Sequence, residues 1–130
     1  MKYSPIKPEI YEKIIQYLPH ADWDKGIAIC YGDTIYSKNQ IPPDIASHEE
    51  IHMYQQQELG PEAWWDKYLK DKSFRFSQEF EAYQYQVKFI KTVIKDRNVK
   101  YKMIHRLAID ISSDMYDNMI SYSQAMILLK

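Results

Sequence analysis

Two histidines four residues apart, with a glutamate beside the first, form the stretch of the chain whose residue types and spacing specify a chemistry. They are His48, Glu49 and His52, in the pattern HExxH. On a helix, positions i and i+4 lie on one face about one turn apart, so both imidazoles can reach one metal ion. Glu49 projects about 100° round the helix from His48, too far for a third ligand but close enough to contact a metal-bound water. The pattern predicts a metal site with Glu49 as general base; the alternative is a surface helix with two unrelated histidines.

The motif needs a third ligand, because a catalytic zinc ion usually takes three protein ligands and leaves one position open for water. Our prediction is Glu79, which lies on a long helix that follows a short intervening one. It shares a side of that helix with Ala82, Tyr83 and Gln86. A small residue at Ala82 permits close approach of the two long helices, since a larger side chain there would push the second helix off the metal.

Three other side chains stand as alternatives to Glu79. Glu81 projects about 200° round the helix from Glu79 and shares the metal only if the register is read differently. His20 lies before a predicted hairpin and His105 lies on a late helix. Each of these histidines is otherwise an ordinary satisfied or exposed side chain.

Strand and helix signals surround the motif and must position it. Residues 27–36 alternate between two faces and turn at Gly32-Asp33, which predicts a β-hairpin. Asp44 is the predicted N-cap of the motif helix, which spans residues 45–58. The other predicted helices cover residues 9–17, a segment starting at Pro61, residues 73–97, residues 99–111 and a last segment capped by Ser121 with Gln124 three residues on.

Length, charge and cysteine content limit the class of protein. The chain has 130 residues, 45% of them hydrophobic, which suits one domain over residues 1–130 with a modest core. The net charge of -1 gives no reason to expect nucleic acid or an anionic membrane as a partner. A single cysteine, Cys30, cannot form an internal disulfide, and no apolar window is long enough for a signal core or a membrane span. We expect a cytoplasmic protein, in the host cytoplasm or in the virion if a phage encodes it.

HExxH followed by ExxA on a second helix, here Glu79-Phe80-Glu81-Ala82, resembles the gluzincin group of zinc metallopeptidases. The small size and the segment 64–69 are similar to the minimal versions found in phages and bacteria. The resemblance implies an α+β, mostly α, minimal zincin-like domain with a small antiparallel sheet. It also implies that His48, His52 and Glu79 bind Zn²⁺ and that Glu49 polarises the water. The chain departs from the pattern at Tyr83, where many gluzincins have an aspartate that orients the histidines, so the support for these ligands must come from elsewhere.

The function expected from these residues is zinc-dependent hydrolysis of peptide bonds in a protein or peptide substrate. Tyr116 is our choice for the group that stabilises the oxyanion, with His105 and Tyr101 as alternatives. The edge of the predicted hairpin is expected to pair with an extended substrate. Two other functions remain open: a phage virion structural or assembly protein, in contact with other particle proteins and retaining zinc with little turnover, and a DNA-associated regulator, which the net charge disfavours.

Overall fold

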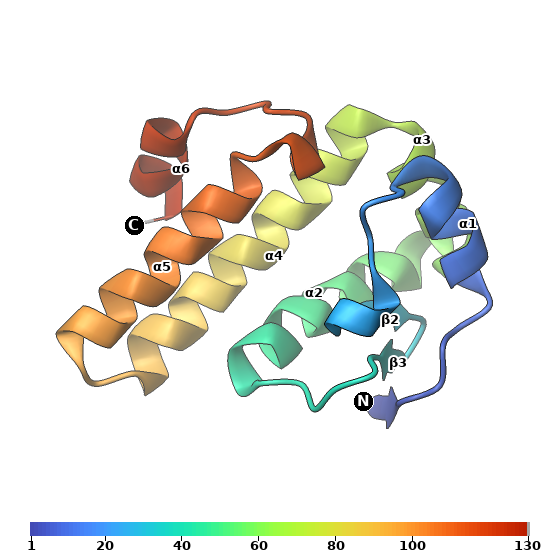
Figure 1. The fold of residues 1–130 in the computed structure, drawn as a ribbon, viewed down its shortest axis with the longest axis horizontal. Helices are drawn as coiled ribbons and strands as arrows, with labels where there is room; N and C mark the ends of the chain where they lie inside the picture. The colour runs from blue at the N-terminus through green and yellow to red at the C-terminus, as the bar shows by residue number, and fades with distance from the viewer. Residues whose placement is uncertain (130) are drawn as a thin grey trace.

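The computed structural model describes residues 1–129, which fold into a mostly helical α+β structure (Figure 1). The α-helices are α1 (Ile10–Tyr17), α2 (Pro43–Leu59), α3 (Pro61–Lys70), α4 (Lys72–Val93), α5 (Arg97–Ile111) and α6 (Tyr122–Leu129). The strands are β1 (Lys2–Ser4), β2 (Ile29–Tyr31) and β3 (Thr34–Tyr36), and two short 3-10 helices are η1 (Trp23–Lys25) and η2 (Asp114–Tyr116). No helix in the described part of the chain is both long and apolar enough to cross a membrane.

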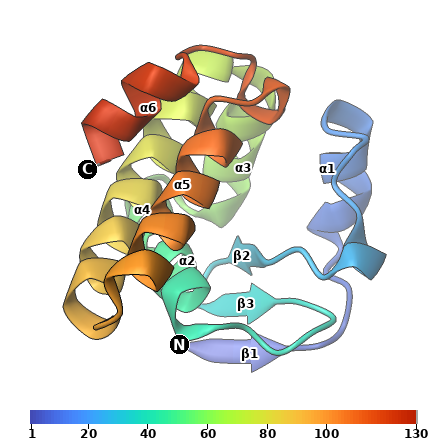
Figure 2. The same cartoon turned by 60° about the vertical axis from the view of Figure 1, so that its left-hand side comes forward.

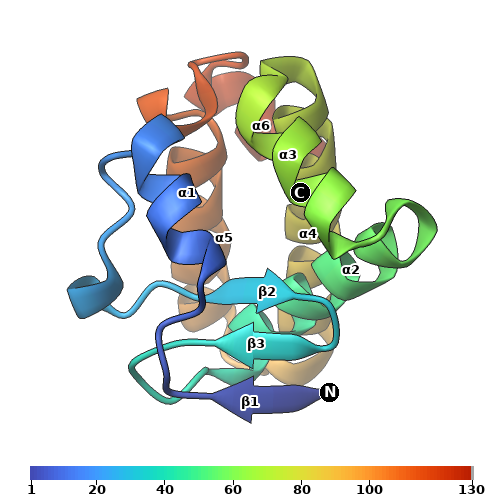
Figure 3. The ribbon, with the colours of Figure 1, turned by 90° about the vertical axis from the view of Figure 1, so that its right-hand side faces the viewer.

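The small sheet has the order β1-β3-β2 (Figure 3). β2 and β3 form the predicted antiparallel hairpin, in which Tyr31 faces Thr34 across a two-residue loop. Gly32 takes a left-handed conformation in this loop, with φ of +62°, which glycine adopts without the penalty that a Cβ would bring. β1 pairs in parallel with the other side of β3, so the sheet is mixed. Its three residues carry no strand signal in the sequence, and the hairpin edge supplies its partner.

The helix that carries the motif, α2, packs along α4, and the ten-residue α3 connects them (Figures 1 and 2). Pro61 begins α3 directly after Gly60, which ends α2. Ala82 is fully buried in α4, in agreement with the predicted close approach of the two helices. α5 lies beside α4 on its other flank and α6 packs against α5.

Two hydrophobic clusters flank α2. The N-terminal cluster joins α1, η1, β2 and α3, and its buried members are Tyr11, Ile14, Trp23, Ile29, Trp64, Trp65, Tyr68 and Leu69. The C-terminal cluster joins α4, α5, η2 and α6, and its buried members are Tyr83, Val87, Ile90, Ile104, Leu107, Ala108, Ile111, Tyr116, Ala125 and Leu129. By contrast, every buried side chain of α2 is polar, namely His48, Glu49, His52 and Gln56. Buried polar groups are stable only when they have partners, so the polar face of α2 is the place to look for a candidate site.

Two predicted helix ends were wrong. Asp44 does not cap α2, because the helix already begins at Pro43 and Asp44 lies in its first turn. The long helix ends at Val93, not Arg97, because Asp96 accepts hydrogen bonds from the backbone N–H groups of Asn98 and Val99 and so caps α5. The predicted cap of the last helix is confirmed, since Ser121 and Gln124 exchange side-chain to backbone hydrogen bonds.

Candidate metal centre

Three side chains from α2 and α4 meet at one point between the two hydrophobic clusters. The Nε2 atoms of His48 and His52 are 3.2 Å apart, and each lies 2.9 Å from Oε1 of Glu79. All three side chains are buried. The rings are held by aromatic neighbours on both sides, with His48 against Tyr83 and His52 against Trp64. Within residues 1–129, these three residues form a group that could hold a metal ion.

The outer nitrogen of His48 has a partner whose orientation is fixed. Nδ1 of His48 lies 2.9 Å from Oε1 of Gln86, and the amide nitrogen of Gln86 lies 2.9 Å from a carboxylate oxygen of Asp44. A carboxylate only accepts hydrogen bonds, so the amide nitrogen must face Asp44 and the amide oxygen must face the ring. Nδ1 of His48 therefore carries the hydrogen, and Nε2 of the neutral ring is left with its lone pair facing Glu79.

The same arrangement holds His52. Nδ1 of His52 lies 2.8 Å from Oε1 of Gln55, whose amide nitrogen donates to the backbone carbonyl of Gln78 and to the carboxylate of Glu81, both at 3.0 Å. Because both of these partners are acceptors, the amide oxygen of Gln55 must face the ring and accept the Nδ1 hydrogen. In its neutral form, each imidazole therefore points an Nε2 lone pair at the same carboxylate oxygen, and a ring that gains a second proton donates to that oxygen instead.

Three acceptor atoms that face one another repel unless a cation lies among them. Ligand atoms about 2.1 Å from one ion and about 90–110° apart are separated by about 3.0–3.4 Å, close to the separations in this group. Two imidazoles and a carboxylate are also a donor set that divalent transition metals accept. The residues present therefore fit a divalent metal ion, with the two glutamines as the outer shell that fixes both histidines.

The second carboxylate oxygen of Glu79, Oε2, accepts hydrogen bonds from tyrosines. The hydroxyl of Tyr68 donates to Oε2 of Glu79 at 2.5 Å, and the hydroxyl of Tyr116 lies 3.5 Å from the same atom. Burial and the charge of Glu79 raise the pKa of both tyrosines well above the ordinary value, so both remain protonated donors. Glu79 is thereby left with Oε1 as its free ligand atom.

The charges of the group are tightly coupled. Burial alone would raise the pKa of Glu79, but the charge of His52 and hydrogen bonds from both imidazoles hold it well below its usual range. Burial alone would lower the pKa of His52, but the charge and hydrogen bond of Glu79 and the charge of Glu49 raise it to about 9. In the absence of a metal ion, a proton on His52 therefore supplies the positive charge that the three donor atoms require.

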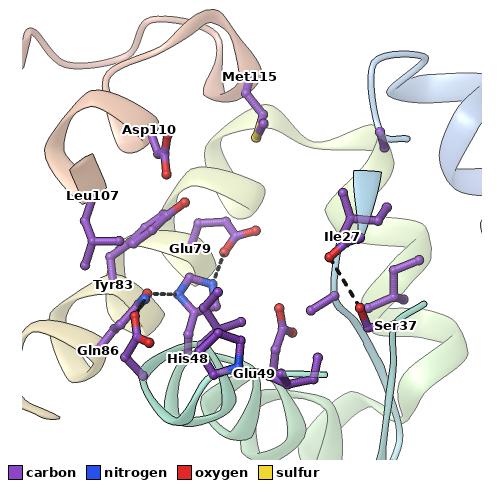
Figure 4. Close-up of a pocket in the computed structure, with 18 of the residues that line it drawn as sticks. Ile27, Ser37, His48, Glu49, Glu79, Tyr83, Gln86, Leu107, Asp110 and Met115 are labelled. Atoms are coloured by element: carbon purple, nitrogen blue, oxygen red, sulfur yellow. Dashed lines mark hydrogen bonds and ion pairs between the residues drawn. The ribbon is translucent and has the colours of Figure 1, made fainter. Parts of the chain in front are cut away.

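Glu49 lies beside this group with its carboxylate in the pocket (Figure 4). The residue is only 7% exposed, yet no side chain or backbone group in residues 1–129 hydrogen-bonds its carboxylate. Burial raises the pKa of this carboxyl, which the nearby histidines counteract. The carboxylate oxygens open into the pocket and are not sealed in the interior, so they are free to contact a group that enters it.

The pocket is a cavity of ≈ 530 Å³ between α1, the hairpin segment, α2 and α5. His48, Glu49 and Glu79 lie in its lining, and much of the remaining wall is apolar, including Ile14, Leu18, Ile29, Ile45, Met103 and Leu107. Such a cavity is in the size range of small-ligand sites. A ligand in it would lie against His48 and Glu79.

Tyr116 reaches the group from η2, with its hydroxyl 3.5 Å from Oε2 of Glu79 and 3.3 Å from the hydroxyl of Tyr83, and its role toward an oxyanion stays a prediction. The two residues after it, Asp117 and Asn118, have positive φ values of 63° and 51°, so the loop turns sharply. The buried guanidinium of Arg75 holds the loop, donating to the carboxylate of Asp117 at 3.0 Å and to the carbonyls of Tyr68 and Leu69 at the end of α3. Arg75 thereby ties together the segments that carry both tyrosines.

The alternatives to these residues lie outside the group. Glu81 accepts a hydrogen bond from Gln55, which in turn contacts His52, so Glu81 does not itself reach the three donor atoms. His20 is exposed on the pocket wall. His105 is hydrogen-bonded to Tyr122 and stacked on the exposed Tyr101, so neither His105 nor Tyr101 contacts the group.

The edge of the hairpin that should pair with a substrate is partly occupied. The carbonyl of Cys30 in β2 accepts hydrogen bonds from Gln56 at 2.7 Å and from Trp65 at 3.0 Å. Gln56 also accepts from the backbone N–H of Gly32, so it fastens the hairpin to α2. Residues 26–29 line the pocket ahead of this point, and substrate pairing along this stretch remains a prediction.

Sequence reasoning missed several residues that support the site. Gln86 could have been found, because it shares a side of its helix with Glu79 and stands one turn beyond Tyr83, the position where the histidine-orienting residue was expected. Gln55 stands three residues after His52 and so on the same side of α2. Tyr68 and Arg75 gave no signal, since their roles depend on how α3 packs against α4.

Comparisons of the chain with protein families, with curated proteins and with solved structures returned no match. Any assignment of function therefore rests on the residues and their geometry.

Proposed function

We propose that the protein is a zinc-dependent peptidase in which Glu49 is the general base. The observation that carries the proposal is the carboxylate of Glu49, which is buried, has no protein partner and faces an open pocket beside three convergent metal-ligand atoms. A metal site that only stabilises a fold is usually closed by four protein ligands, whereas this group has three in residues 1–129. A site for electron transfer alone would not need such a base.

Zinc, when bound to His48, His52 and Glu79, supplies a Lewis acid that brings the pKa of a water from about 15.7 towards 7. Glu49 takes the proton of the attacking water and then passes it to the leaving amine. Tyr116 turns its hydroxyl hydrogen from the long 3.5 Å contact with Glu79 to the carbonyl oxygen as negative charge develops on that oxygen. The hydroxyl of Tyr68 keeps Glu79 in place throughout, and the apolar walls limit competition from bulk water.

The test is metal analysis of the purified protein followed by hydrolysis of an unfolded casein-type substrate. Wild type should retain one equivalent of zinc and cleave the substrate. Glu49→Gln should retain the zinc and lose about 10²- to 10⁴-fold in rate, the usual contribution of general base catalysis. Glu50→Gln is the matched control, because Glu50 is exposed on the same helix, and its rate should equal that of wild type.

Two results would reject the proposal. Retention of iron in place of zinc would reject the assignment of zinc as the metal. Equal rates of hydrolysis for wild type and Glu49→Gln would reject Glu49 as the general base. Zinc retention with no hydrolysis of any substrate would favour the alternative of a virion structural or assembly protein in which the metal stabilises the fold.

A further inference from the structure

A second carboxylate enters the same pocket from the opposite wall. Asp110, in the last turn of α5, projects towards the metal group, and Figure 4 shows it above Tyr83 and Glu79, across the cavity from Glu49. Its side chain is partly buried, and no hydrogen bond or ion pair in residues 1–129 involves its carboxylate. The mechanism described above does not use it.

Asp110 forms no ion pair within residues 1–129. Arg106 lies one turn earlier on α5 and also lines the pocket, but its side chain is exposed and the two do not form an ion pair. Burial raises the pKa of Asp110, and the charges of Arg106 and His48 only partly counteract this effect. A carboxylate in a partly desolvated, largely apolar cavity is stabilised by any cationic group that enters.

The other acidic side chains that line the cavity already have partners or roles. The carboxylate of Asp44 accepts from Gln86, and that of Glu79 belongs to the metal group. Glu49 faces the attacking water in the proposed reaction. Asp110 is therefore the acidic side chain of the pocket that remains for substrate recognition.

We infer that Asp110 selects substrates that place an ammonium or guanidinium group beside the scissile bond. The group is either a free N-terminal amine or the side chain of a lysine or arginine, and both offer the same charge-assisted hydrogen bond to the carboxylate. The inference rests on the proposed function and names its substrate class. Acidic residues at the same substrate position are disfavoured, because they would meet a carboxylate at short range.

The test measures binding and not turnover. Zinc-loaded Glu49→Gln protein is titrated by calorimetry with acetylated alanine-based hexapeptides that carry one lysine, and with the same peptides carrying norleucine instead. An unacetylated all-alanine hexapeptide tests the N-terminal amine. Either a lysine peptide or the unacetylated peptide should bind roughly 10- to 100-fold more tightly than the uncharged norleucine peptides. This is the usual effect of a hydrogen bond to a charged group.

The second step replaces the carboxylate. Adding Asp110→Asn keeps the shape of the side chain but should abolish the preference for the cationic peptide while leaving the affinity for the norleucine peptide unchanged. Asp114→Asn is the matched control, since Asp114 is exposed on η2 and outside the pocket lining, and it should leave the preference intact. Asp110→Lys should shift the preference to peptides that carry glutamate.

Equal binding of cationic and neutral peptides, no binding of either, or a preference that survives Asp110→Asn would overturn the inference. These outcomes are separate from failure of the proposed function, which is the absence of Glu49-dependent hydrolysis by the wild type. A cationic preference without hydrolysis would still support Asp110 as a recognition residue of this pocket.

Discussion

The hydroxyl of Tyr68 lies 2.5 Å from Oε2 of Glu79, which leaves Oε1 of the same carboxylate 2.9 Å from both histidine Nε2 atoms. The two oxygens of Glu79 therefore have separate roles, one held by the protein and one offered to a metal ion. The other glutamate on α4, Glu81, does not share this environment, so the assignment of the third ligand can be tested by comparing the two residues.

Glu79→Gln should reduce zinc retention strongly, because an amide is a much poorer zinc ligand than a carboxylate. Glu81→Gln should retain one equivalent, since Glu81 contacts Gln55 and not the metal group. Metal content after dialysis against a weak chelator measures both. The reverse pattern would move the third ligand to Glu81.

Gln86→Leu should weaken zinc binding by about 10- to 100-fold, the usual effect of removing an outer-shell partner of a ligating histidine. The variant loses the acceptor that fixes the Nδ1 hydrogen of His48. Competition with a chromophoric chelator gives the affinity. Gln124→Leu is a suitable control, because Gln124 caps the distant α6, and its zinc affinity should match that of wild type.

Tyr116→Phe should keep the zinc and lower kcat by about 10²- to 10³-fold, as loss of one oxyanion-stabilising donor does. The ring of Tyr116 remains in place against Tyr83, but its buried hydroxyl contact with Tyr83 at 3.3 Å is lost, so the free energy of unfolding should fall by about 1 kcal/mol. Tyr101→Phe removes the hydroxyl of an exposed tyrosine and should leave kcat unchanged. Unchanged turnover in Tyr116→Phe would restrict this tyrosine to packing.

Zinc binding should release about one proton at pH 7. In the metal-free protein the pKa of His52 is raised to about 9, so His52 is protonated at pH 7 and must lose its proton before it can bind zinc. The apparent zinc affinity should therefore rise about tenfold per pH unit between pH 7 and 9 and level off above 9. Calorimetry in buffers of different ionisation enthalpy counts the protons, and a count of zero would contradict the assignment.

The sequence predicted the parts of the site that follow from helical periodicity. His48 and His52 share a face of α2, and Glu79 belongs to a second helix that the small Ala82 allows to come close. The roles of Gln55 and Gln86 were harder to predict, because an amide accepts or donates according to what lies on its other side. Here that depends on Glu81 and Asp44, which reach the glutamines only after α2 and α4 have packed.

Short elements were predicted less well than long ones. The hairpin was found because its two strands alternate in polarity around a glycine turn, whereas β1 forms only by pairing with β3. The end of α4 was misplaced because its apolar stripe runs on to Ile94, while the cap formed by Asp96 ends the helix earlier. Local capping decided the boundary over hydrophobic periodicity.

The polar face of α2 has a consequence for how the protein unfolds. With no buried apolar side chain of its own, this helix meets the N-terminal and C-terminal clusters through polar contacts, among them His48, His52 and Glu79, so removal of a bound metal should weaken the cooperativity between the clusters. All three tryptophans, Trp23, Trp64 and Trp65, lie in the N-terminal cluster, whereas α5, α6 and much of α4 belong to the C-terminal one. Thermal unfolding followed by tryptophan fluorescence and by far-ultraviolet circular dichroism should coincide with zinc bound and separate after chelation, with the two halves melting as distinct units.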